Sequence, residues 1–143
     1  MSVNKKIDFG VKAFIIRDGK FLVMHNNGEK RDLWELPGGR MQFGENAEQT
    51  LKREMMEETG LEVNLTKILD TWDRFVGDDY QVTGIICLCS AKEGQVVISD
   101  EHDSYQWLPI KSSSVECLYD HFRSRMVKWD WNALQKHEKV QAD

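Results

Sequence analysis

The sequence predicts an α+β fold in which a mixed, curved β-sheet lies between α-helices. Apolar stretches of strand length, bounded by turn residues, lie on both sides of a polar segment with helical character. That segment has its own start and stop residues, and a second stretch with helical spacing of apolar residues closes the chain. At 143 residues, we expect one domain over 1–143 that buries about two thirds of its unfolded surface.

Turn residues divide the chain into its strands. Asp18-Gly19 separates two apolar stretches and is a strong hairpin signal, and Gly77-Asp78-Asp79 forms a second turn. Polar residues 27–32 favour a loop, after which a short strand leads into a turn at Gly38-Gly39. The predicted strands are 9–17, 20–26, 34–36, 65–76, 81–91 and 105–109.

The helix predicted over 47–59 is defined by its ends. Asn46 and Gln49 have the spacing of a capping box, in which each side chain accepts a hydrogen bond from the other residue's backbone amide. Gly60 suits the left-handed conformation that ends a helix. A second helix is predicted over 115–137, with buried positions at Val115, Leu118, Phe122, Met126, Trp129 and Leu134.

Three glutamates of the first helix lie where its apolar side is expected. At about 100° per residue, Glu54, Glu57 and Glu58 fall within an arc of about 100°. Glu-rich helices usually present a solvated acidic face, but that explanation fails here because the arc overlaps the apolar stripe. The stripe consists of Ala47, Leu51 and Met55.

This arrangement destabilises the helix unless a cation offsets it. Like charges three or four residues apart cost about 0.2–0.5 kcal/mol per pair, and acids in the last turn oppose the helix dipole by about 0.3–1 kcal/mol each. Arg53 can neighbour Glu57 and reach back to Glu45, but one arginine cannot neutralise four acids. Clustered carboxylates suit a hard divalent cation, so the sequence predicts a site for Mg²⁺ or Mn²⁺.

The same residues stand at the spacing of a known motif. Gly39, Glu45, the run Arg53-Glu54-Met55, the pair Glu57-Glu58 and the ending Gly60-Leu61 match the Nudix box, with all nine specified positions satisfied within 23 residues. The chain therefore resembles the Nudix hydrolases, whose fold is a mixed sheet between helices, and the order of elements is similar over about residues 7–110. The approach to the box is also similar: Trp34-Glu35-Leu36-Pro37-Gly38-Gly39.

The resemblance and the helix geometry together give a set of metal ligands. Glu54 and Glu58 are four residues apart and are the first choice for direct ligands. Arg53 and Glu45 are expected to form an ion pair that orients the cluster, so that their removal weakens the chemistry. The full expected ligand set is the side chains of Glu54, Glu57 and Glu58 and, by the resemblance, the main-chain carbonyl of Gly38.

Family members often carry one more acid on a loop beyond the sheet. Glu101 is its expected counterpart here, as an outer metal ligand or as the base. Asp100, His102 and Asp103 remain alternatives, because this stretch also has the composition of a solvated loop. The general base stays open between Glu54 and Glu101.

Substrate contacts are predicted from position and residue type. Arg40 follows the Gly-Gly turn, and His25 ends a strand where some relatives place an arginine, so both are expected near phosphates. Each also has an ordinary structural explanation, as a surface arginine or a strand-end histidine. Residues suited to stacking on a base or hydrogen-bonding to it are Trp72, Phe75, Tyr119 and Asp120. The alternative for each of the four is an ordinary place in the core or on the surface.

The predicted function is a divalent-metal-dependent pyrophosphohydrolase similar to the MutT-type branch. Its expected substrate is a nucleoside triphosphate, oxidised ones included, cleaved to a monophosphate and pyrophosphate. A hydrolase of ADP-ribose, a nucleotide sugar or a dinucleotide is the alternative, although such relatives often have a proline beyond the box, and this chain has only Pro37 and Pro109. The third possibility is a non-catalytic nucleotide-binding regulator, but such modules usually lose box acids, which this chain retains.

The composition limits the class of partner and the compartment that we expect. With a net charge of −5, the chain lacks the basic surface of a nucleic-acid or membrane-surface binder, so we expect a small nucleotide as partner and a monomer or homodimer. Lys12 and Arg17 interrupt the first apolar stretch, so no export signal or membrane span is predicted. Cys87, Cys89 and Cys117 are expected as free thiols in a reducing, cytoplasmic compartment, because no second ligand pair supports a zinc site.

Overall fold

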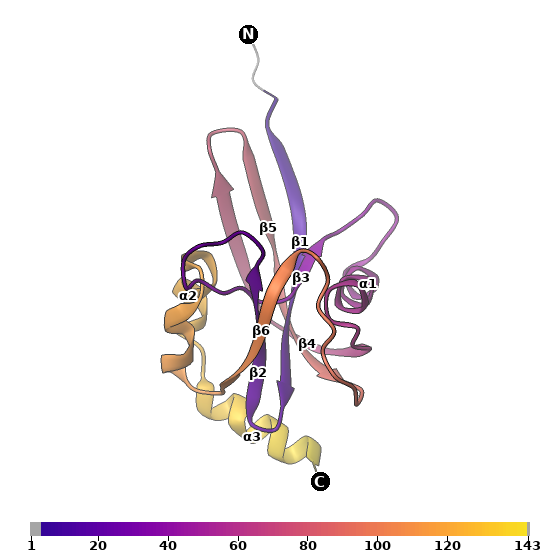
Figure 1. The fold of residues 1–143 in the computed structure, drawn as a ribbon, viewed down its shortest axis with the longest axis vertical. Helices are drawn as coiled ribbons and strands as arrows, with labels where there is room; N and C mark the ends of the chain where they lie inside the picture. Colours follow the sequence, from indigo (N-terminus) through magenta and orange to yellow (C-terminus); the bar gives the residue numbers. More distant parts are fainter. Residues whose placement is uncertain (1–3, 143) are drawn as a thin grey trace.

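The computed structural model describes residues 4–142, with side chains described up to residue 137, so residues 1–3 and 143 of the predicted domain lie outside the described part. Helices cover both faces of a mixed β-sheet, α1 on one and α2 and α3 on the other, which confirms the predicted α+β fold (Figure 1). None of the helices in the described part is long and apolar enough to cross a membrane. The elements are β1 (Lys6–Arg17), β2 (Lys20–Asn26), β3 (Gly38–Arg40), α1 (Ala47–Thr59), β4 (Val63–Val76), β5 (Tyr80–Ala91), β6 (His102–Pro109), a 3₁₀ turn η1 (Ser112–Cys117), α2 (Asp120–Met126) and α3 (Trp131–Ala142).

Strand β1 is the centre of the sheet, whose order is β4-β5-β1-β2-β6. It pairs parallel with β5 over ten residues, Lys6 to Ile15, and antiparallel with the short β3. It pairs with β2 only near the hairpin, where Ile16 lies opposite Phe21. The two hairpin strands therefore diverge, and β2 continues the sheet through β6 instead.

The chain before β3 fills the gap between the diverging strands. The amide of Ala13 in β1 donates to the carbonyl of Pro37, and the amide of Met24 in β2 donates to the carbonyl of Glu35, both at 2.8 Å. These bonds satisfy backbone groups that would otherwise be unpaired inside the protein. They also hold Gly38, at the start of β3, against the middle of β1.

Each face of the sheet has its own core, because side chains alternate along a strand. Ala13 belongs to the cluster beneath α1, together with Leu51 and Met55 of that helix. Phe14 belongs to the cluster on the other face, beneath α2 and α3, with Phe122 and Leu134. The buried helical face predicted from residue spacing is thus confirmed at Leu51 and Met55.

Helix α1 has the predicted ends. The side chain of Asn46 accepts a hydrogen bond from the amide of Gln49, and the side chain of Gln49 accepts one from the amide of Asn46. Gly60 ends the helix in the left-handed region, with φ at 70°. Local sequence determines both ends of this helix, so the residues of its last turn are fixed in position.

The single helix predicted over 115–137 is wrong. The chain is extended at Leu118, because residues on both sides of it bond to Trp34: the amide of Trp34 donates to Cys117 and that of Tyr119 donates to Trp34. A second break precedes α3, where the Asp130 side chain accepts from the amide of Ala133. The predicted buried residues lie in the core except Trp129, which is partly buried: Val115, Leu118, Phe122, Met126 and Leu134.

Several strand limits also differ from the prediction. The strand expected over 34–36 is wrong, since Trp34 and Glu35 make only isolated bridges. The turn expected at Gly38-Gly39 is also wrong, because both glycines pair with β1 as part of strand β3. Strand β6 begins at His102, three residues before the predicted start, because it continues to pair with β2 there. The cysteines of the described part are free thiols, as predicted.

Candidate active site

A cleft of about 570 Å³ opens where β1, β3 and α1 meet. Its floor is formed by alternate residues of β1, Asp8, Gly10 and Lys12, which share one face of the strand. Gly38 and Gly39 of β3 and the acids Glu54 and Glu58 of α1 also line it. The other lining residues include Trp72 and Arg74 of β4, Tyr80 and Val82 of β5, and Glu101.

Two glycines allow the backbone of β3 to approach both β1 and α1. Gly38 has φ at 137°, and a Cβ at this position would overlap the carbonyl oxygen of Val11. A Cβ at Gly39 would overlap the carboxylate of Glu54. A side chain at Gly38 would push β3 away from the backbone of β1, and one at Gly39 would displace the Glu54 carboxylate.

Glu58 is the buried acid of α1. Only 5% of the residue is exposed, and its Oε2 accepts a 2.9 Å hydrogen bond from the amide of Gly38. Burial raises the pKa of Glu58 to about 7, and the charge of Lys12 and the Gly38 amide counteract only part of that effect. This position matches the expectation that Glu58 lies within the apolar stripe. A cation near the carboxylate would lower the cost of ionising it.

The other acids of the helix are more open to solvent. Glu54 lines the cleft, with 13% of its side chain exposed, whereas Glu57 is 58% exposed and is not among the lining residues. Glu54 and Glu58 therefore face the cleft directly. Glu57 reaches the site only through its neighbour Arg53, at 3.4 Å.

Arg53 holds the acids together. Its guanidinium donates to both carboxylate oxygens of Glu45, at 2.6 and 2.9 Å, and to Glu54 at 2.8 Å. It also donates to the carbonyl of Arg40 at 3.0 Å, which ties α1 to the end of β3. The bonds from Arg53 hold the pKa of Glu45 down at about 2. The ion pair expected from the sequence is therefore present, and it is partly buried.

A buried polar network that the sequence analysis missed lies beneath Gly38. Lys12 is 8% exposed, and its Nζ lies 3.4 Å from Glu35 and 3.3 Å from the carbonyl oxygen of Gly38. Glu35 also contacts His102, with 2.8 Å between Oε2 and Nε2. Burial opposes ionisation of Glu35, but the charge of Lys12 and the His102 hydrogen bond outweigh it and hold its pKa at about 2. The sequence feature that could have indicated this network is Lys12, a charged residue within the apolar stretch of β1.

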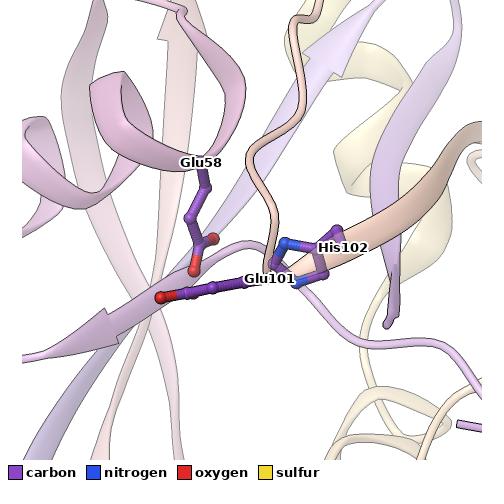
Figure 2. A group of neighbouring side chains, drawn as sticks. All are labelled: Glu58, Glu101 and His102. Atoms are coloured by element: carbon purple, nitrogen blue, oxygen red, sulfur yellow. The ribbon is translucent and has the colours of Figure 1, made fainter. Parts of the chain in front are cut away.

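Glu101 reaches the site from the loop before β6. Its carboxylate and that of Glu58 point toward each other, with the ring of His102 beside them (Figure 2). One ligand atom from each of these residues lies within 4.8 Å of the other two. Carboxylate oxygens with a Gly38 carbonyl nearby are the donors that divalent cations take, so the residues fit the predicted metal.

Two predicted substrate contacts line the cleft. Arg40 donates to Asp8 at 3.3 Å and to the Tyr80 hydroxyl at 3.1 Å. Trp72 is 4% exposed and donates a 3.3 Å bond from its ring nitrogen to the carbonyl of Gly10. Both side chains are therefore held in place by the cleft itself.

The remaining predicted contacts lie outside this cleft. His25 bonds to Asp103 at 2.8 Å and to the carbonyl of Arg31 at 3.0 Å. Both ring nitrogens of His25, at the end of β2, are therefore bonded within the protein. The other three are Phe75, which is 70% exposed, Asp120, which lines a separate hollow with Phe75, and Tyr119, whose hydroxyl donates to Glu29.

Comparison with known proteins gives a consistent set of relatives. The NUDIX domain family model matches residues 7–130. The chain is 34% identical over 100 residues to the oxidized purine nucleoside triphosphate hydrolase of Danio rerio, which covers 68% of this chain and 64% of that protein. It is 34% identical over 85 residues to the asymmetrical bis(5'-nucleosyl)-tetraphosphatase of Mus musculus, covering 56% and 58%. The chain thus spans less than two thirds of the length of these two relatives.

Solved structures agree with the fold. The MutT protein from Methanosarcina mazei Go1 is similar with a TM-score of 0.74 and 26% identity, over 96% of this chain and 99% of that chain. A UDP-X diphosphatase has a TM-score of 0.71 at 24% identity, over 95% of this chain and 66% of that chain. The predicted mixed sheet between helices is confirmed by these neighbours.

Proposed function

The chain belongs to the Nudix hydrolase family, and on this basis we propose that it is a divalent-metal-dependent pyrophosphohydrolase of a nucleoside triphosphate. One observation supports this most strongly. The cleft that contains Glu54 and Glu58 also contains Arg40, whose guanidinium is suited to phosphate. Trp72 also lines the cleft, but only 4% of it is exposed, so it would form part of the wall. A triphosphate lying along β1 would contact both the acids and Arg40.

The metal would be held at the acidic end of the cleft. Its ligands would be the carboxylates of Glu54, Glu58 and Glu101 and the carbonyl of Gly38, all of which line the cleft. The exposed carboxylate of Glu57, which contacts Arg53, would have to rotate toward the cleft to complete the predicted set. Lys12 takes one lone pair of that carbonyl, and a carbonyl oxygen has two. When bound, Mg²⁺ or Mn²⁺ neutralises phosphate charge and makes water nucleophilic near neutral pH.

The protein's own groups would direct the reaction. Water oxygen bonds to the second phosphorus, and the bond from that phosphorus to the oxygen bridging the first and second breaks, leaving the monophosphate with that oxygen. The proton from water passes to Glu54 or Glu101, both of which line the cleft. Arg53 keeps Glu54 aimed at the cleft.

Hydrolysis of a nucleotide panel tests the proposal. Nucleoside triphosphates, including an oxidised purine triphosphate, are incubated with Mg²⁺, and pyrophosphate and orthophosphate are measured separately. We expect pyrophosphate from a triphosphate with wild type and none with Glu58→Gln. Inactivity of the wild type on every nucleotide with either metal would favour the non-catalytic regulator instead.

A dinucleoside polyphosphate is the second candidate substrate. The cleft is lined by Arg74 in addition to Arg40, which gives it two arginines that could bind the phosphates of a longer polyphosphate chain. The mouse relative is named for a substrate of this chemistry. The same panel separates the two candidates, because a dinucleoside tetraphosphate would yield nucleotides and no pyrophosphate. ADP-ribose and a nucleotide sugar in the panel test the remaining alternative.

A further inference from the structure

His102 is a buried histidine with one unused ring nitrogen. The residue is 3% exposed, and its Nε2 lies 2.8 Å from the Oε2 of Glu35. Its Nδ1 is buried without a hydrogen-bond partner among the described residues. A buried polar atom that bonds to nothing is costly, so this nitrogen requires an explanation.

His102 belongs to a cluster with two acids. One ligand atom of His102 and one oxygen each of Glu58 and Glu101 lie within 4.8 Å of one another, and the three side chains converge in Figure 2. Ligands at about 2.0–2.2 Å from a transition-metal ion are up to about 4.4 Å apart across it. Glu101 is exposed on a loop, so a small side-chain rotation closes the remaining distance.

We propose that the Nδ1 of His102 is a metal ligand, which together with the carboxylates of Glu58 and Glu101 forms a mixed nitrogen and oxygen site. This inference rests on the divalent-metal function proposed above, and adds a nitrogen donor to its carboxylate set. The site therefore takes a transition-metal ion in preference to Mg²⁺, because imidazole nitrogen suits the transition metals and Mg²⁺ favours oxygen.

Glu35 and Lys12 prepare the histidine for this role. An ionised carboxylate only accepts hydrogen bonds, so Glu35 fixes the proton on Nε2 and leaves the lone pair on Nδ1. Lys12 in turn contacts the other oxygen of Glu35. A carboxylate bonded to the far nitrogen is the usual support of a metal-bound histidine.

Pulsed electron paramagnetic resonance of bound Mn²⁺ tests the ligand directly. Wild-type protein is prepared with natural histidine and with nitrogen-15 histidine, which requires no mutation. We expect a nitrogen coupling of directly bound imidazole that changes with the isotope. His102→Gln should lose this coupling, and the matched control His137→Gln, on α3, should keep it.

The outcomes separate this inference from the proposed function. If Mn²⁺ binds without nitrogen coupling, His102 only positions the site through Glu35, and the inference is wrong although the metal function stands. A coupling that survives in His102→Gln also overturns it. If no Mn²⁺ binds at all, the proposed metal function fails as well.

Metal preference gives a second readout. Calorimetric titration of wild type and His102→Gln with Co²⁺ and with Mg²⁺ gives the ratio of the two affinities. Loss of the nitrogen donor should lower the Co²⁺ affinity about tenfold or more and leave that for Mg²⁺ within about twofold. Equal losses for both ions would show a general distortion of the site and contradict a nitrogen ligand.

Discussion

The amide of Gly38 donates a 2.9 Å hydrogen bond to the Oε2 of Glu58, joining the start of β3 to the last turn of α1. The bond orients a carboxylate that is otherwise buried, with 5% of the residue exposed. It leaves the second oxygen of Glu58 for other partners. The position of the Glu58 carboxylate is therefore set both by α1, which carries it, and by Gly38 of β3, which binds it.

Replacing Glu58 with glutamine should abolish hydrolysis and leave the metal-free fold as stable or more stable. Burial raises the folded-state pKa of Glu58 from 4.5 to about 7, so the folded protein binds this proton more tightly than the unfolded chain. Stability is therefore lost as pH rises from about 4.5 to about 7. Glutamine still accepts the Gly38 bond and removes that loss, a gain of up to about 3 kcal/mol above pH 7.

Thermal melts with a chelator at about pH 5 and about pH 8 check this prediction. The variant should melt higher than wild type at the higher pH and differ less at the lower pH. A clearly lower melting temperature at the higher pH would mean that Glu58 stabilises the fold as an ion-pair member.

Mg²⁺ or Mn²⁺ should raise the melting temperature of the wild type, because a ligand bound only by the native state stabilises it. At 100 times the dissociation constant the gain is about 2.7 kcal/mol. Glu54→Gln should reduce this rise. Glu48→Gln is the matched control, since Glu48 lies exposed on the same helix and pairs with Lys52. An undiminished metal response in Glu54→Gln would remove Glu54 from the ligands.

Arg53→Lys should weaken hydrolysis without abolishing it. A lysine keeps the charge but cannot donate to Glu45 and Glu54 in the present geometry, so the acids lose their orientation. Loss of such supporting contacts costs about 10–100-fold in activity or metal affinity. Steady-state kinetics with Lys52→Arg as control measure it, and unchanged activity in Arg53→Lys would show that the ion pair is dispensable.

Arg40→Ala should raise KM about tenfold and change kcat less, if Arg40 binds a phosphate outside the reacting centre. Arg123→Ala provides an arginine control, because Arg123 pairs with Asp120 away from the cleft. A fall in kcat at constant KM would instead place Arg40 at the reacting phosphate.

Helix α1 could be predicted from the sequence because its determinants are local. The capping box at Asn46 and the glycine at Gly60 set its ends, and the period of its apolar residues placed Glu58 inside the buried stripe. The second helix could not be predicted in the same way. Its interruption at Leu118 depends on backbone bonds to Trp34, which no local pattern encodes.

The site residues also fall into two groups, those that local sequence predicts and those that depend on contacts between distant parts of the chain. The places of Glu54 and Glu58 and the contact between Arg53 and Glu57 follow from spacing along one helix. The network of Lys12, Glu35 and His102 joins residues 23 and 67 positions apart, on different strands and loops, so it appears only when the chain is folded.

The most direct test of the central proposal is the position of oxygen-18 after hydrolysis of a deoxynucleoside triphosphate in labelled water with Mg²⁺. Mass spectrometry of the products identifies the phosphorus that water attacks. We expect the label in pyrophosphate, since attack on the second phosphorus transfers the water oxygen to that product. Label in the nucleoside monophosphate would move the attack to the first phosphorus, and orthophosphate as the initial product would contradict a pyrophosphohydrolase.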